Sequence, residues 1–235
     1  MHDRPIAQRR RVLLAGAGAL LAGCATPAYV PAPDGAGAAP VVRVGERWRY
    51  AQIDLYRKER TAELTMEVAE TAPQLRVRVS DASGAPRADE IYQSPWRVVQ
   101  EPAYGEPIVF RDPNPVLPTR LEAGARERIS NRFRAARGEL WLFWSEWIDA
   151  PGWERVRVPA GEFVALRVER RIAFDHQDPF RTASAREETL WYAPQVKRWV
   201  RREWTGRYRS AGGGGREAWI NEDRVAWELL EYRAA

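Results

Sequence analysis

The residues best suited to acid–base or metal chemistry lie in one short polar stretch. Asp175, His176 and Asp178 fall within four consecutive positions, and an imidazole flanked by carboxylates can ligate a cation or act as a general base. Such a stretch is also typical of a hairpin loop, which is the interpretation we adopt. Metal binding and catalysis at these residues are the alternatives, and we expect neither a metal nor a cofactor.

A serine hydrolase built on this chain would have to use His176, because His2 lies in an N-terminal segment that we expect to be removed. Its nucleophile would be one of three serines: Ser94, Ser145 or Ser184. None of these serines stands in the G-x-S-x-G sequence of a nucleophile elbow. Glu187 and Glu188 are adjacent in an expected strand, so they point to opposite faces and cannot act as a catalytic pair. We therefore expect a protein that is not an enzyme, with a hydrolase as the distant alternative.

Aromatic residues that could contact a ligand are concentrated in residues 140–148, which read LWLFWSEWI. In an extended strand Trp141, Phe143 and Trp147 share one face, and Leu142 and Trp144 share the other. Such a strand is either buried on both faces, or it presents one face to a ligand cavity or a docking surface. The candidate contacts for a ligand or partner are Trp141, Phe143, Trp144 and Trp147.

The first 23 residues have the parts of a secretory signal peptide. Arginines at positions 9–11 supply positive charge, and the apolar run at 12–23 is too short to span about 30 Å of hydrocarbon as a helix. Arginine pairs of this kind precede apolar runs in both general secretory and twin-arginine signals, and both export routes stay open. We expect residues 1–23 to be a cleaved signal peptide.

The apolar run ends in Leu21-Ala22-Gly23-Cys24, which resembles the lipobox of bacterial lipoproteins. That resemblance implies that Cys24 becomes the lipidated N-terminal residue, carrying fatty-acyl chains such as palmitate. Ala25 follows the cysteine where an aspartate would imply retention at the inner membrane, so the resemblance implies the outer membrane. Cys24 is also the only cysteine, which excludes a disulfide within the chain.

Most of the net positive charge of the chain comes from the expected signal peptide. Removal of residues 1–23 takes away four of 37 basic residues and one of 32 acidic residues, which lowers the formal charge from +5 to +2. The remaining arginines alternate with acidic residues, whereas nucleic-acid binding needs a clustered basic surface. We therefore expect no nucleic-acid partner.

Composition divides the rest of the chain in two. Residues 24–40 are rich in Pro, Ala and Gly, and we expect them to form the lipidated cysteine and a flexible tether. Residues 41–235 are enough for one domain. We expect that domain to be built from antiparallel β-strands.

Alternation of apolar and charged residues predicts these strands. The period of two is clearest in residues 64–68, 75–79 and 164–168. Pro159-Ala160-Gly161 predicts a hairpin turn. We predict a mostly β fold with little helix: a single curved antiparallel sheet or half-barrel of roughly 8–11 strands.

Two segments fit the alternation less well. Residues 102–118 hold five prolines, which favours a long loop or an edge crossover. Residues 225–229 alternate like a strand, but Asn221 could also cap a helix there. We favour the strand and keep the helix as the alternative.

Four segments of the body carry a wider resemblance: residues 45–50, 158–163, 189–194 and 227–232. They resemble a set of uncharacterised proteobacterial envelope proteins that are similar in layout to lipoprotein-carrier (Lol-type) half-barrels. The resemblance implies a curved antiparallel sheet with an apolar concave side and supplies no catalytic residues. Gln195-Val196-Lys197 replaces the glycine-bearing turn that is usual in those proteins.

These features together predict a lipoprotein of the bacterial cell envelope, anchored in the outer membrane through its N-terminal lipid and facing the periplasm. Its expected function is to bind an apolar ligand such as an acyl chain or a lipoprotein. The alternative is a structural or assembly protein that docks an envelope protein through its Trp-rich strand.

Overall fold

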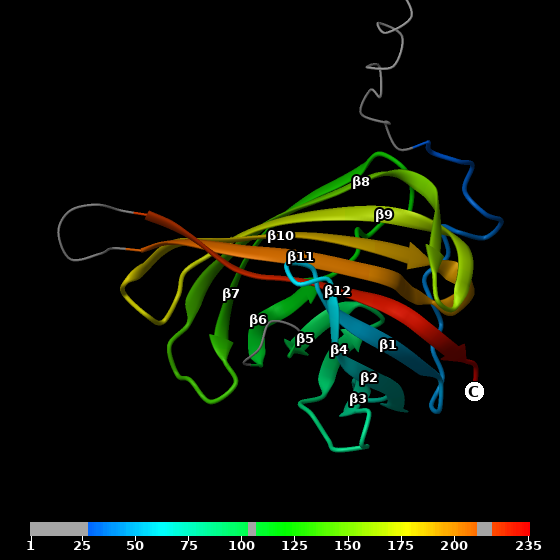
Figure 1. Cartoon of the computed structure of the whole chain (residues 1–235), viewed down its shortest axis with the longest axis horizontal. Coiled ribbons are helices and arrows are strands. Elements are labelled where there is room, and N and C mark those ends of the chain that lie inside the picture. Colours follow the sequence, from blue (N-terminus) through cyan, green and yellow to red (C-terminus); the bar gives the residue numbers. More distant parts are fainter. Residues whose placement is uncertain (1–27, 103–106, 211–217) are drawn as a thin grey trace, which may run out of the picture.

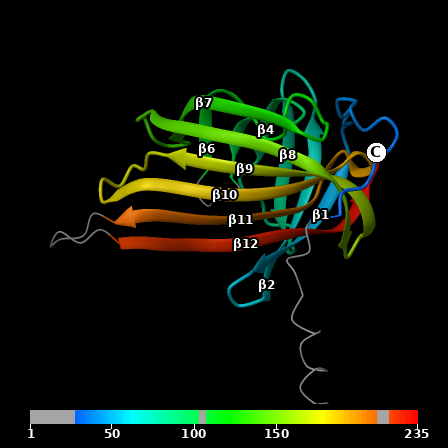
Figure 2. The same ribbon diagram turned by 90° about the horizontal axis from the view of Figure 1, so that it is seen from above.

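The chain forms a closed antiparallel β-barrel in a computed structural model that describes residues 28–102, 107–210 and 218–235. Around the barrel the strands follow the order β1-β12-β11-β10-β9-β8-β7-β6-β5-β4-β3-β2, so nearly all neighbours are consecutive in sequence (Figure 1, Figure 2). The prediction of a mostly β fold is confirmed, but the prediction of an open sheet or half-barrel of 8–11 strands is wrong. The expected signal peptide, the lipobox and Cys24 lie outside the described residues.

Twelve strands make up the barrel in the described part of the chain. They are β1 (Arg47–Asp54), β2 (Glu59–Glu70), β3 (Leu75–Asp81), β4 (Glu90–Ser94), β5 (Arg97–Glu101), β6 (Ile108–Pro115), β7 (Ala125–Ala135), β8 (Leu142–Val158), β9 (Gly161–Phe174), β10 (Arg181–Ala193), β11 (Arg198–Ser210) and β12 (Ala218–Arg233).

Closure depends on pairing between β1 and β12, which lie far apart in sequence. Trp48 of β1 pairs with Tyr232 of β12 on one side and with Met66 of β2 on the other. The Trp48 and Tyr232 rings also stack with their centres 5.9 Å apart. Period-two patterns report which residues share a face, but they do not report which strand lies beside which. Hence the sequence could not distinguish a closed barrel from an open sheet.

The proline-rich segment corrects a second expectation, because part of it forms β6 inside the barrel wall. Pro115 and Asn114 pair with β5, whereas only residues 108–110 of β6 pair with β7. A proline lacks the N–H needed for one side of a ladder. The prolines of β6 are accommodated because that end of the strand pairs on one side only.

Other local predictions are confirmed. A hairpin turn joins β8 to β9 at residues 159–160, and Gly161 follows it with φ of +136°, which favours glycine. Residues 225–229 belong to β12 and are extended rather than helical. The described helix Pro194–Val196 is a single 3₁₀ turn, and Lys197 after it has φ of 58°, the left-handed conformation that a glycine would adopt easily. Among the described residues, no helix has the length and hydropathy needed to cross a membrane.

Part of the expected tether lies against the barrel. The backbone N–H of Val30 donates to the carbonyl of Trp153 at 2.7 Å, and this contact extends the sheet beyond Ala150, the last β8 residue that pairs with β7. Ala36 is buried as well. The described chain therefore reaches the barrel along β8 (Figure 1).

Candidate functional site

A network of buried ion pairs fills part of the barrel interior. Arg170 of β9 donates from Nε to Glu146 of β8 at 2.5 Å and also pairs with Glu188 of β10. Glu188 in turn pairs with Arg202 of β11, and Arg202 Nη2 donates to Glu101 of β5 at 2.5 Å. All five side chains are almost completely shielded from solvent. Charges taken out of water in this way need partners on several sides.

A second buried pair joins Arg198 to Glu90, whose Oε2 lies 2.6 Å from Arg198 Nη2. Burial opposes the charge of Arg198, but the nearby Glu90 carboxylate outweighs it and the Arg198 pKa lies above its usual range. The guanidinium carbon of Arg198 is 4.1 Å from the ring centre of Trp199 and 4.8 Å from that of Trp96. Cation–π contacts replace water as partners of this cation.

These buried charges were not identified from the sequence, although a signal was present. Arg170 has the same parity as the apolar Val168 and Ile172, and Glu146 has the same parity as Trp144 and Ile148. A charge on the apolar face of a strand predicts either a buried pair or a functional site. Aromatic side chains and ion pairs fill much of the barrel interior among the residues described.

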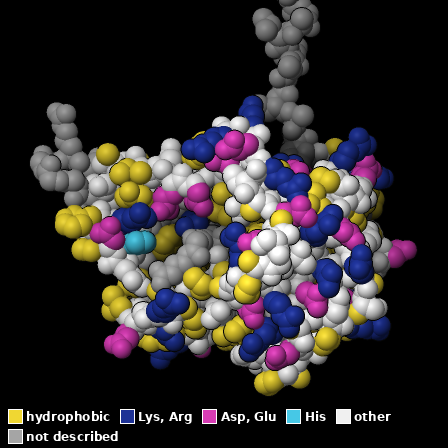
Figure 3. Space-filling view, turned by 60° about the horizontal axis from the view of Figure 1, so that its bottom comes forward, with side chains coloured by type: hydrophobic (Ala, Val, Ile, Leu, Met, Phe, Trp, Pro, Cys, Tyr) yellow, Lys and Arg dark blue, Asp and Glu magenta, His cyan; other side chains and the backbone are white. Residues whose placement is uncertain are grey.

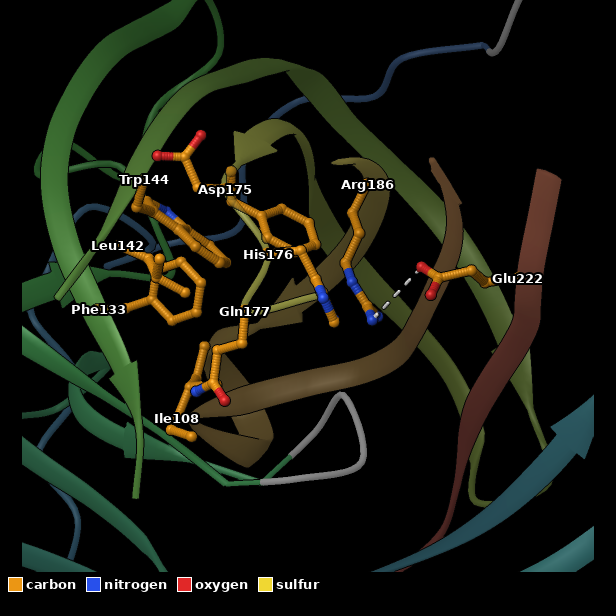
Figure 4. Close-up of a pocket in the computed structure, with 11 residues that line it drawn as sticks. Ile108, Phe133, Leu142, Trp144, Asp175, His176, Gln177, Arg186 and Glu222 are labelled. Carbon is orange, nitrogen blue, oxygen red and sulfur yellow. Dashed lines mark ion pairs between the residues drawn. The ribbon is translucent and has the colours of Figure 1, made fainter. Parts of the chain in front are cut away.

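A cavity of about 140 Å³ lies beside the β9–β10 loop (Figure 4). Its wall contains Phe133 of β7, Trp144 of β8 and Phe174 of β9. The ring centres of Phe133 and Phe174 lie 5.4 and 5.7 Å from that of Trp144, within the range of favourable aromatic packing. Trp144 also donates from its indole N–H to Glu146 Oε2 at 2.9 Å, which ties this wall to the buried ion pairs. We call this cavity the aromatic pocket.

Polar groups line the other side of the aromatic pocket. Arg186 and Glu222 point toward one another there, with Nη2 and Oε2 3.9 Å apart (Figure 4). His176 and Gln177 from the β9–β10 loop complete this side, and the surface is hollowed beside the histidine (Figure 3). Burial and the positive charge of Arg181 lower the pKa of His176, which favours the neutral imidazole. An apolar wall with a few polar groups opposite is a common arrangement for binding small molecules.

Among the described residues, no hydrogen bond joins His176 to Ser94, Ser145 or Ser184. His176 Nδ1 accepts a hydrogen bond from the backbone N–H of Asp178 at 3.0 Å, as in a local loop. Ser145 lies on the same outer face of β8 as Trp147, and Ser184 is buried in β10. In residues 28–102, 107–210 and 218–235, no group of three or more His, Cys, Asp or Glu side chains is arranged to hold a metal ion. Glu187 is exposed and Glu188 is buried, on opposite faces as predicted.

The aromatic residues at positions 141–147, at and just before the start of β8, separate into two groups. Trp144 points inward and lines the aromatic pocket. Trp141, Phe143 and Trp147 lie on the outer face, where 38%, 48% and 38% of their surfaces are exposed. The strand is therefore not buried on both faces, and these three residues do not line the aromatic pocket.

No protein-family model and no curated protein matches the chain. Two solved structures are similar to it. One is a candidate lipoprotein from Parabacteroides distasonis ATCC 8503, with 14% identity and a TM-score of 0.48 over 83% of this chain and 97% of that one. The other is a candidate exported protein with YmcC-like fold from Bacteroides fragilis NCTC 9343, with 15% identity and a TM-score of 0.47 over 83% and 98%. Similarity at this level does not define a function.

Proposed function

We propose that the protein is a non-enzymatic lipoprotein of the bacterial envelope that binds a small apolar group in the aromatic pocket. The lipobox ending at Cys24 supports the lipid anchor, on the periplasmic side of the outer membrane, reached by the general secretory or the twin-arginine route. The observation that carries the binding proposal is the three-ring wall of Phe133, Trp144 and Phe174 around about 140 Å³.

The size of the aromatic pocket limits the ligand. A cavity of roughly 150 Å³ lined by apolar side chains binds benzene, so about 140 Å³ accommodates a ring or a short segment of acyl chain. Burying one side chain of that size is worth about 1.5–3 kcal/mol, and we therefore expect weak binding of short ligands. A longer amphiphile would place only the end of its chain in the pocket. The acyl-chain ligand expected from the sequence is therefore limited here to a short chain or to the end of a long one.

The test is an NMR titration of the tryptophan indole N–H signals, with Trp144→Phe to assign the signal of Trp144. The chain beginning at residue 24, with Cys24→Ser, retains every described residue. Hexanoate should shift the Trp144 signal with saturation. Acetate, which has the same carboxylate without the apolar chain, should not.

A pair of alanines on β7 provides a matched control. Ala135 lines the aromatic pocket, whereas Ala125 is equally buried outside it. Ala135→Leu should fill the cavity and abolish the shift, and Ala125→Leu should leave it unchanged in a folded protein. An unchanged Trp144 signal in the wild type, or equal effects of the two leucine variants, would contradict the proposed ligand site.

A second candidate function is docking of an envelope protein through the Trp-rich strand. The observation that favours docking is the outward position of Phe143 and Trp147 on β8 and of Trp141 just before it. Exposed aromatic side chains that lie close together are unusual on a surface that contacts only water.

A further inference from the structure

The outer face of β7 and β8 carries three arginine–aromatic pairs, which we call the outer stripe. The guanidinium carbon lies 5.2 Å from the ring centre in the first pair, 4.9 Å in the second and 5.5 Å in the third. The pairs are Arg128–Trp147, Arg132–Phe143 and Arg134–Trp141.

The register of the two strands produces this stripe. Arg128 is directly opposite Trp147, and Arg132 is directly opposite Phe143. Arg171 of β9 pairs with Trp147 from the other side, so this ring lies between two arginines. From Trp141 to Trp147 the stripe is about 20 Å long, at about 3.3 Å per residue.

The arginines of the outer stripe have unbalanced positive charge. Among the described residues none of Arg128, Arg132, Arg134 and Arg171 forms an ion pair with a carboxylate, whereas Arg126, next along β7, pairs with Asp149 at 3.4 Å. At the other end, Asp175 accepts from the backbone N–H of Phe143 at 3.4 Å, and Glu139 is exposed two residues before Trp141. This face therefore presents net positive charge together with large apolar rings.

The N-terminal segment places the same face near the lipid anchor. The Tyr29 ring lies against Gly152 of β8, about 17 Å along the strand from Trp147. Cys24 lies five positions before Tyr29, and a fully extended chain of five residues spans at most about 18 Å. If Cys24 is lipidated, the part of β8 at Gly152 must stay within that distance of the membrane.

We propose that the outer stripe rests on the surface of an anionic lipid bilayer. This inference rests on the membrane anchor at Cys24 but not on a ligand in the aromatic pocket. Aromatic rings suit the interface, where their apolar bodies lie at the level of the headgroups. Arginines beside them bind lipid phosphates, and each strengthens binding to an anionic surface by roughly fivefold.

The short stretch of chain between β8 and Cys24 favours lipid over a protein as the partner of the outer stripe. Both partners could offer negative charge to the arginines, but the link from Gly152 to Cys24 keeps Trp147, the near end of the outer stripe, within about 35 Å of the bilayer. Two weak contacts on one molecule reinforce each other because the second binding step becomes intramolecular. The stripe would thus fix the orientation of a barrel that the lipid alone leaves free to rotate.

The test measures co-sedimentation with vesicles of the chain from residue 24 carrying Cys24→Ser, so that no lipid anchor contributes. Binding should occur on vesicles of phosphatidylglycerol mixed with phosphatidylcholine, weaken as salt rises, and be absent on phosphatidylcholine alone. Combined Arg128→Gln, Arg132→Gln and Arg134→Gln should weaken binding by roughly tenfold or more.

The matched control removes three exposed arginines from the opposite side of the barrel, on β3 and the β1–β2 turn: Arg57, Arg76 and Arg78. This control lowers the net charge equally and should retain binding. No binding of the wild type to anionic vesicles would overturn the proposal and leave a protein partner as the occupant. Equal losses in the two triple variants would also overturn it, since only net charge would then matter.

A labelled cysteine provides a second test, in which the arginines and aromatic rings of the outer stripe stay in place. Ser145 lies between Phe143 and Trp147 on the outer face, and Ser80 is a serine of similar exposure on β3. With Cys24→Ser as background, a polarity-sensitive dye on Ser145→Cys should shift to the blue on anionic vesicles, and the dye on Ser80→Cys should not. The same shift at both positions would contradict a specific docking face.

Discussion

Arg170 and Glu188 are directly opposite each other on β9 and β10, inside the barrel, and form an ion pair in which neither side chain is exposed. Arg170 also pairs with Glu146, so one guanidinium joins three neighbouring strands. A buried cation placed in this way is stabilising only while its partners are present. The strands β8, β9 and β10 are therefore coupled through a single side chain.

Arg170→Met should lower the free energy of unfolding by about 3–5 kcal/mol, because it removes the only cation that pairs with Glu146 among the described residues and one of the cations that pair with Glu188. Urea melts of the wild type and the variant measure this difference. The neighbouring Arg171 is exposed, and Arg171→Met should change the stability by no more than about 0.5 kcal/mol. A small effect of Arg170→Met would show that the buried carboxylates find other partners.

Glu101 should make the stability depend on pH. Burial raises its pKa above the ordinary value of 4.5, and the charges of Arg202 and Arg170 only partly oppose this. Because the folded state binds this proton more tightly than the unfolded state, the resulting stabilisation is complete below 4.5 and is lost as pH rises through the folded pKa.

The matched variant is Glu101→Gln, which cannot titrate. The free energy of unfolding of the wild type should fall relative to that of the variant as pH rises above 4.5. Urea melts of both proteins over a series of pH values give this difference. If the difference in the free energy of unfolding between the two proteins did not change with pH, or changed in the opposite direction, the raised pKa of Glu101 would be contradicted.

Gly152→Ala should detach the N-terminal segment from β8 without unfolding the barrel. An added Cβ would lie 2.5 Å from the Tyr29 ring, closer than packed atoms allow. The amide of Val30, which donates to Trp153, should then exchange its hydrogen faster. Gly37→Ala in the same segment is the control, since a Cβ there meets no atom within 4 Å. Equal exchange of the Val30 amide in both variants would show that Tyr29 does not hold the segment.

Lipidation at Cys24 should be visible in the mass of the protein extracted from membranes. The chain should begin at a Cys24 that carries acyl groups, and Cys24→Ser should release the protein into the periplasm. A water-soluble wild type that retains residues 1–23 would contradict the anchor, whatever the behaviour of the aromatic pocket.

Local pattern predicted most strands because burial on one side of a sheet imposes a period of two. Residues 64–68 and 75–79 fall within β2 and β3 for this reason. The same pattern did not predict β6. Prolines fit in that strand because its proline-containing end pairs with a neighbouring strand on one side only. The pairing of β1 with β12 joins residues that lie far apart in the chain, and a single sequence does not indicate which distant strands pair.

The candidate site was only partly predictable. The sequence indicated a strand rich in aromatics, and Trp144 does line a cavity. It could not indicate which parity faces inward, because apolar residues occupy both faces of β8. The arginines that cover Trp147 and Phe143 come from β7, and their alignment depends on register between two strands.

Closure of the barrel through β1 and β12 has a consequence for the order of folding. Until residues 218–233 are present, β1 is an unpaired edge, although β2 to β11 can already pair with their neighbours in sequence. Exposed edges of this kind pair readily with other chains. A chain that crosses a membrane in an extended form, N-terminus first, would therefore expose the unpaired edge of β1 until the last strand arrives.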